Sequence, residues 1–296
     1  MPIKHTYSIL CCNLSLVAKI ALIILIVLLL AVACFYGLLH PIYLNIREII
    51  ENQNFAVDAN ELINHPIVTL SSLAKSYIGF FEQLHWQKSF LFAVLLLIGF
   101  KFFLTLPLLP ATKVLHTKMS TGFDIGILNA FISTGFQNLL LAFVSSIVLT
   151  IVDVALVAAL LALCYGLLTL IGIFAFPITL LVALFLFTAR MTIVCQWLPE
   201  ICASQSKNIF RNLGNGLLFS LKRFEKNFLC LLFINVVIVA IVSSTMIFSF
   251  GVIPILMLPI YYVQYCIMTL TLNFSYHKSK YFIDNGTTVF TPTRLF

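Results

Sequence analysis

Two charged residues lie inside apolar stretches and are the first candidates for chemistry. Lys101 falls within one apolar run, and Asp153 is the only charged residue between Leu139 and Ala189. A charge at the bilayer centre costs about 2.5–3.5 kcal/mol on insertion scales, so each residue needs a partner or water. Counted from the predicted cytoplasmic side, their Cα levels differ by roughly 9 Å, a gap that a lysine side chain largely covers. We therefore consider an ion pair or proton-responsive site, against Lys101 snorkelling alone and Asp153 facing water near the outer surface.

Two polar stripes could line a path or join helices. Ser146, Thr150 and Asp153 share one face of the run 139–163 at helical spacing. A second stripe, in the run 252–274 and just beyond it, consists of Tyr262, Tyr265, Thr269, Asn273 and Tyr276. Such stripes usually hold helices together through hydrogen bonds. Lining a substrate path is the alternative interpretation.

The segment from Arg211 to Lys226 is basic and amphipathic. Its lipid head-group candidates are Arg211, Lys222, Arg223 and Lys226. Each base near an anionic lipid surface contributes about 1 kcal/mol of attraction. The same charges could simply set membrane orientation on a helix that lies at the interface.

Motifs for catalysis, metals and cofactors are missing from the sequence. The six histidines show no HxxxH or HExxH spacing, and the eight cysteines contain no CxxC. The chain also lacks the glycine-rich nucleotide motifs and GxSxG. We therefore predict no catalytic residue, no metal and no cofactor, and expect a protein that is not an enzyme. No run of five basic residues occurs, so the net charge of +7 does not indicate nucleic-acid binding.

The elements that must position these residues are membrane helices. Of all residues 61% are hydrophobic and only 9% are charged, against about 25% charged in a soluble domain. Apolar runs of about 20 residues span the hydrocarbon core as helices. The prediction is an all-α, polytopic transmembrane bundle of about six helices with short interfacial amphipathic helices, one integral membrane domain over 1–296. The predicted spans are 20–39, 90–109, 139–163, 168–189, 227–248 and 252–274.

Local signals place the boundaries of some spans. Pro107 and Pro110 should close the second span, and Pro254 and Pro259 should bend the last. The turn between the third and fourth spans is expected near Tyr165-Gly166.

The distribution of basic residues predicts orientation. Of the 17 Lys and Arg residues, Arg47, Lys75 and Lys88 fall in the predicted outer loop 41–89, and Lys101 lies within a span. The others lie at the ends of the chain and in the alternate loops, which the positive-inside rule assigns to the cytoplasm. Both termini are therefore predicted to be cytoplasmic. Within the outer loop, the spacing of apolar residues from Ile67 to Leu84 predicts a helix on the membrane surface.

The segments 120–189 and 208–275 resemble each other and form a weak internal repeat. In each segment an amphipathic stretch precedes a two-helix hairpin, and Asn138 and Asn227 each open the first span of the hairpin. The two units run in the same sense, which suggests a pseudo-twofold axis along the membrane normal. Similar apolar composition alone could also produce this pattern.

The layout resembles a bacterial superfamily, the YciC-like inner-membrane proteins and the membrane domain fused to some glycerophosphodiester phosphodiesterases. The stretches that carry the resemblance are Ala189-Arg190-Met191, Trp197-Leu198-Pro199-Glu200 and the basic amphipathic segment from Gly216 to Phe228. In that family an arginine ends a helix, a proline-containing loop follows, and a basic amphipathic segment enters the next span. Gly214 and Gly216 stand where alanines are usual. The resemblance implies a multi-pass protein of the bacterial inner membrane more than it implies an activity.

Together these observations predict a non-enzymatic membrane-organising or accessory component. The alternatives are a small-solute transporter and a lipid-handling protein, flippase-like or enzymatic. Expected partners are the lipid bilayer, including anionic lipids, and a membrane-protein partner or further copies of the chain. A transporter should respond to changes at Asp153, whereas an accessory protein should tolerate them.

Overall fold

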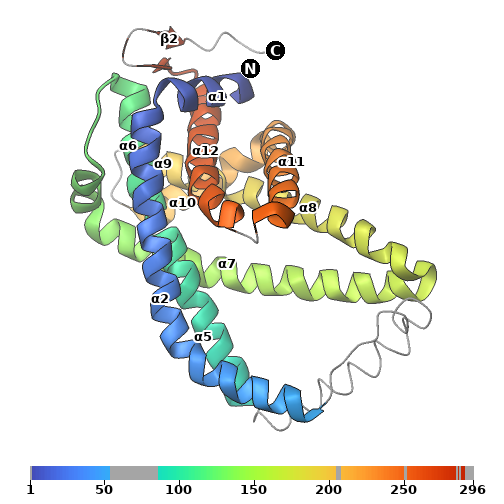
Figure 1. Ribbon diagram of the computed structural model, residues 1–296. Coiled ribbons are helices and arrows are strands. Elements are labelled where there is room, and N and C mark those ends of the chain that lie inside the picture. Colours follow the sequence, from blue (N-terminus) through green and yellow to red (C-terminus); the bar gives the residue numbers. More distant parts are fainter. Residues whose placement is uncertain are drawn as a thin grey trace. The chain divides into compact units, whose positions relative to one another are not determined.

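The computed structural model describes residues 2–53, 86–204, 208–249, 252–284, 286 and 288–290, and they form an all-α helical bundle (Figure 1). Its helices are α1 (Pro2–Cys12), α2 (Leu14–Gln53), α5 (Trp86–Thr105), α6 (Leu108–Thr121), α7 (Ile127–Ile171), α8 (Ala175–Val194), α9 (Trp197–Ala203), α10 (Ile209–Lys222), α11 (Phe224–Ser249) and α12 (Val252–His277). A short 3-10 turn, η1 (Gly172–Phe174), precedes α8. Strands β1 (Tyr281–Phe282) and β2 (Val289–Phe290) pair antiparallel after α12. Within these residues, six helical segments are long and apolar enough to cross a membrane.

The chain divides into two compact units. The first unit comprises Met1–Leu28, Phe103–Val144 and Leu184–Phe296, and the second comprises Leu29–Phe102 and Ser145–Ala183.

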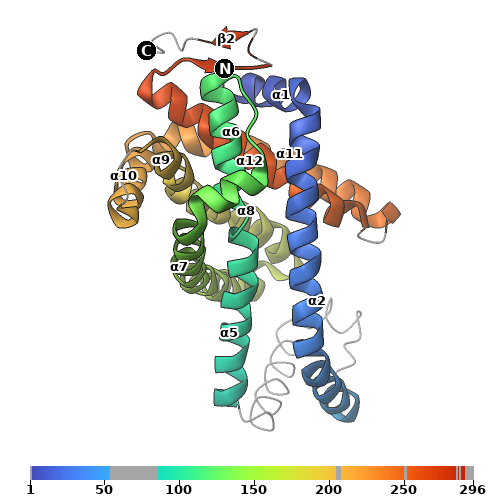
Figure 2. The same cartoon turned by 90° about the vertical axis from the view of Figure 1, so that its left-hand side faces the viewer.

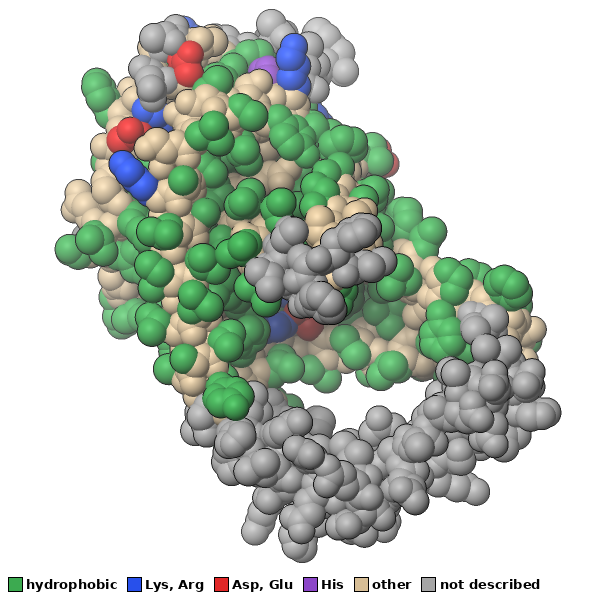
Figure 3. Space-filling model, in the orientation of Figure 1, with side chains coloured by type: hydrophobic (Ala, Val, Ile, Leu, Met, Phe, Trp, Pro, Cys, Tyr) green, Lys and Arg blue, Asp and Glu red, His purple; other side chains and the backbone are tan. Residues whose placement is uncertain are grey.

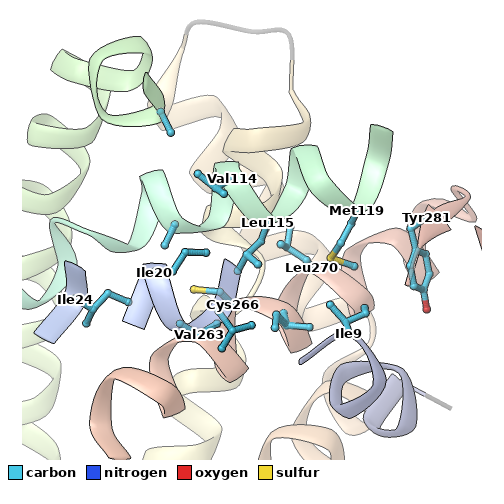
Figure 4. Packing of buried hydrophobic residues seen from close by; sticks show 14 of the residues in the cluster. Ile9, Ile20, Ile24, Val114, Leu115, Met119, Val263, Cys266, Leu270 and Tyr281 are labelled. Carbon is cyan, nitrogen blue, oxygen red and sulfur yellow. The ribbon is translucent and has the colours of Figure 1, made fainter. Parts of the chain in front are cut away.

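The core of the first unit forms where α1, α2, α6 and α12 meet (Figure 4). Ile9 and Ile20 come from the N-terminal helices, Leu115 from α6, and Cys266 and Leu270 from α12. These side chains are at most 2% exposed. Branched and thiol side chains of this kind pack closely and bury no unpaired strong donor, so they hold α12 at the centre of the unit.

The N-terminal helix α1 and the β1–β2 pair lie together in the first unit (Figures 1 and 2). His5 Nδ1 lies 2.6 Å from the hydroxyl of Tyr281, and Asn13 Nδ2 donates to the carbonyl of Ile283 at 2.9 Å. The ring of Phe290 is 4.1 Å from the ring of His5. We call His5, Asn13, Tyr281, Ile283 and Phe290 the terminal cluster. It joins α1 to the β1–β2 pair at one end of this unit.

Large apolar side chains are exposed along the spans. Ile132 is 81% exposed, Leu170 79% and Leu180 71%. On the face drawn in Figure 3, hydrophobic side chains cover much of the surface of the described residues. Water would penalise so much exposed apolar area, whereas lipid would not. The protein is therefore an integral membrane protein with several spans.

The structure corrects several predicted helix boundaries. The first predicted span, 20–39, is part of α2, which begins at Leu14 and continues to Gln53. Residues 41–53 of the predicted outer loop are therefore helical, because apolar composition marks the lipid-buried length of a helix and not its end. The rest of that loop, including the helix predicted from Ile67 to Leu84, lies mainly outside the described residues.

The turn between the third and fourth spans was predicted in the wrong place. Gly166 lies inside α7, and the chain turns at η1, where Gly172 has a φ of 60°. A residue with a Cβ rarely adopts that conformation, so the glycine at 172 marks the reversal. The amphipathic stretch predicted before the third span is also continuous with it, because α7 runs unbroken from Ile127. Before the fifth span, in contrast, α10 is a separate helix.

Two prolines act at the α5–α6 junction. The second span was predicted to close at 109, but α5 ends at Thr105 and α6 starts at Leu108. Pro107 is the N-cap of α6, and Pro110 lies in its first turn, where a missing backbone N–H removes no helical hydrogen bond. The predicted spans at 227–248 and 252–274 correspond closely to α11 and α12, and Pro259 lies inside α12.

Candidate functional site

Lys101 and Asp153 form an ion pair in the second unit. Lys101, near the end of α5, donates from Nζ to Asp153 Oδ2 on α7 and to the carbonyl of Leu149 at 3.2 Å. The two side chains are 18% and 19% exposed. Sequence reasoning left open whether Lys101 instead snorkels alone, and the geometry favours the pair. Each charge is neutralised where lipid would otherwise penalise it.

The rest of the α7 stripe supports the helix. Ser146 and Thr150 are buried, and the hydroxyl of Thr150 donates to the carbonyl of Ser146 at 2.6 Å. Such a bond within one helix turn satisfies the hydroxyl without a partner from outside. Asp153 is therefore the one ionisable residue of this stripe, and the whole stripe lies in the second unit.

The α12 stripe lies in the first unit, whereas the α7 stripe lies in the second. Thr269 donates to its own helix at the carbonyl of Cys266. Tyr262 and Tyr265 are partly buried and pack against the buried clusters beside α12. Asn273, 3% exposed, donates hydrogen bonds to Gln196 and Glu200, and the ring of Tyr276 lies 4.4 Å from that of Phe219 on α10.

Asn273 leads to a buried acid that sequence reasoning did not select. Its Nδ2 donates to Gln196 Oε1 at 3.0 Å and to Glu200 Oε1 at 2.9 Å. His277 Nε2 lies 2.7 Å from the same oxygen of Glu200. The Glu200 side chain is 8% exposed and that of His277 is 37% exposed. We call Gln196, Glu200, Asn273 and His277 the Glu200 cluster.

The Glu200 cluster joins α9 to the last turn of α12. The Glu200 carboxylate accepts from Asn273 and lies within hydrogen-bond distance of His277, so it is not left without partners in its buried position. Glu200 was noticed only as part of Trp197-Leu198-Pro199-Glu200. Its partner His277 is 77 residues away in sequence, so no spacing rule could have connected them.

A second polar contact crosses three helices in the first unit. Asn235 on α11 donates to Thr188 Oγ1 on α8 at 2.8 Å and accepts from the hydroxyl of Tyr261 on α12 at 2.7 Å. Both hydrogen-bonding ends of the Asn235 amide are used inside the protein. This is the arrangement of an interhelical fastener.

The four head-group candidates differ in exposure. Arg211 and Lys222 are exposed on α10. Arg223 lies over the ring of Tyr276, 5.2 Å from its centroid, and Lys226 is partly buried. Only the first two therefore point freely away from the protein.

Metal-ligand geometry is not found among the described residues, where no three His, Cys, Asp or Glu side chains gather. No family model, curated protein or solved structure matches the chain. What the sites support must therefore be argued from their geometry.

Proposed function

We propose that this integral membrane protein is a non-enzymatic accessory or membrane-organising component of a bacterial inner membrane. The observation that carries the proposal is the internal use of polar groups in the first unit. Asn235, Tyr261 and Thr188 bond to one another, and Asn273 bonds to Gln196 and Glu200. Polar groups that hydrogen-bond to one another in this way hold helices together, and their hydrogen bonds are not available to a transported solute.

We also propose that both ends of the chain lie in the cytoplasm. The terminal cluster joins α1 to the segment that follows α12, which supports an even number of membrane crossings. The basic residues favour the cytoplasm for that side. The resemblance to YciC-like inner-membrane proteins agrees with this arrangement and with a role that needs no catalytic constellation.

A second candidate, a small-solute transporter coupled to protons, is favoured by one observation. Lys101 and Asp153 are both partly exposed, at 18% and 19%, within apolar spans. An ionisable pair with some access could exchange a proton during transport. In the accessory role, by contrast, the Lys101–Asp153 pair only stabilises the contact between α5 and α7 and exchanges no proton.

Reconstitution separates the two candidates. The purified full-length protein is placed in liposomes that contain a pH-sensitive dye, and proton flux is followed under an imposed pH gradient and membrane potential. The accessory role predicts flux equal to that of protein-free liposomes, both for the unsubstituted protein and for Asp153→Asn. Flux that exceeds the blank and disappears in Asp153→Asn, with the variant still folded, would support the transporter.

A second measurement tests the accessory role directly. The protein is purified under mild conditions from its native membranes, with and without the double substitution Lys101→Leu/Asp153→Leu. The proposal predicts one membrane-protein partner at fixed stoichiometry in both preparations. A protein that elutes alone in both would contradict it.

A further inference from the structure

α10 has two faces with different surroundings. Asn212, Gly216 and Ser220 are buried against the protein, and the position of a Cβ on Gly216 lies only 2.9 Å from the carbonyl oxygen of Gln196. The opposite face carries Phe210, 66% exposed, and two leucines. The tight contact at Gly216 fixes which face of α10 is turned outward.

The outward face is apolar with a basic edge. Phe210, Leu218 and Leu221 are 66%, 56% and 54% exposed, and at 100° per residue they fall within an arc of about 80°. Arg211 and Lys222, both exposed, lie next to this arc, within about 40° of Leu218. A helix with large apolar side chains beside a basic edge suits the boundary between acyl chains and head groups.

The neighbours of α10 place it at that boundary. The candidate span that precedes it ends at Ala203, and the one that follows begins at Phe224, so α10 connects two bilayer crossings. At its C-terminal end, the ring of Phe219 lies 4.4 Å from Tyr276 and 5.3 Å from His277. Aromatic side chains gather at membrane interfaces in this way.

We propose that the outward face of α10 binds anionic phospholipid. Phe210, Leu218 and Leu221 enter the acyl region, and Arg211 and Lys222 contact the phosphate of the head group. The charge complementarity of two exposed bases beside an apolar face selects a lipid over an apolar protein surface. The proposal rests on membrane embedding alone, and it holds whether the protein is an accessory component or a transporter.

The test measures lipid retention by the full-length protein in detergent. Phosphatidylglycerol or phosphatidylcholine with the same acyl chains is titrated in, and bound copies are counted by native mass spectrometry. We expect preferential retention of phosphatidylglycerol. Arg211→Gln/Lys222→Gln should weaken that preference about 30-fold, the factor expected for two bases near an anionic surface.

A matched control removes two exposed bases from elsewhere in the first unit. Lys4→Gln/Lys280→Gln makes the same change in net charge and should leave the preference within about threefold of the unsubstituted value, because neither base lies on α10. Equal retention of the two lipids by the unsubstituted protein would overturn the proposal. An equal loss of lipid preference in the control variant would also overturn it. So would a dimer of the protein that persists when lipid is added and dissociates on Leu218→Gln/Leu221→Gln, because the outward face of α10 would then bind a second copy of the chain.

Discussion

At the scale of residues, Lys101 and Asp153 are opposite charges within apolar spans that neutralise each other. Two lone charges in apolar runs were visible in the sequence, and a rough depth estimate brought them within reach of each other. Whether Lys101 pairs with Asp153 or snorkels alone depends on the direction of the Lys101 side chain, and a hydropathy pattern does not indicate that direction. The contact of Lys101 Nζ with Asp153 and with the Leu149 carbonyl supplies that direction.

This pair should behave as a coupled unit in stability measurements. Asp153→Leu leaves Lys101 as an uncompensated charge in an apolar span and should lower the free energy of unfolding by about 3 kcal/mol. Lys101→Leu/Asp153→Leu removes both charges and should return to within about 1 kcal/mol of the unsubstituted protein. Thermal unfolding in the same detergent measures all three. A double variant as unstable as the single one would rule out the pair.

The Glu200 cluster gives a second prediction at this scale. Glu200→Ala leaves the side chains of Asn273 and His277 without their shared acceptor and should cost about 1–3 kcal/mol of stability. Glu225→Ala removes an acid that is exposed in the first turn of α11, and should cost less than about 1 kcal/mol. If the two alanine variants unfolded at the same temperature, the hydrogen bonds of Glu200 would contribute no more to stability than an exposed acid does.

At the scale of elements, apolar composition located the spans but not their ends. Runs such as 227–248 correspond to α11 because polar residues flank them closely. The predicted turn at Tyr165-Gly166 failed because a glycine inside apolar sequence looks the same whether it is helical, as Gly166 is, or has a positive φ, as Gly172 has. Only tertiary context distinguishes the two.

Two glycines of α10 make opposite predictions for the same substitution. Gly216→Ala places a methyl group 2.9 Å from the carbonyl oxygen of Gln196 and should destabilise the protein by about 1–3 kcal/mol. Gly214→Ala meets nothing within 4 Å and should stabilise it by up to about 1 kcal/mol, because alanine favours the helix. Paired unfolding curves test the sign. A stabilising Gly216→Ala would show that α10 does not pack on the Gln196 carbonyl.

At the scale of the whole molecule, the terminal cluster connects the first helix to the last strands, which no sequence pattern indicated. Burial lowers the pKa of His5 below its usual value, and the positive charges of the amino terminus and Lys4 lower it further. Burial also raises the pKa of Tyr281, so the phenol keeps its proton and can donate to a neutral His5. The contact between the chain ends is therefore suited to neutral pH.

Acid should weaken this contact. Well above its ordinary pKa of about 6.5, His5 is neutral in both the folded and the unfolded chain. As the pH falls through that value, the unfolded chain takes up the proton first, so stability decreases. The unfolding midpoint should therefore drop between pH 7.5 and 5.5, and His5→Gln should show a smaller drop. An unchanged drop in the variant would assign the pH dependence to other groups.

Membrane sidedness is the prediction on which the placement of every site depends. The terminal cluster needs both chain ends on one side, and an odd number of crossings would separate them. Alkaline phosphatase fusions after Gln53 and Phe174 should be active outside the cytoplasm, whereas green fluorescent protein fusions after Ser204 and Lys280 should fluoresce inside. Activity of a phosphatase fusion after Lys280 would contradict the assignment of the basic loops to the cytoplasm. It would also move α10, with Arg211 and Lys222, to the leaflet that faces away from the cytoplasm.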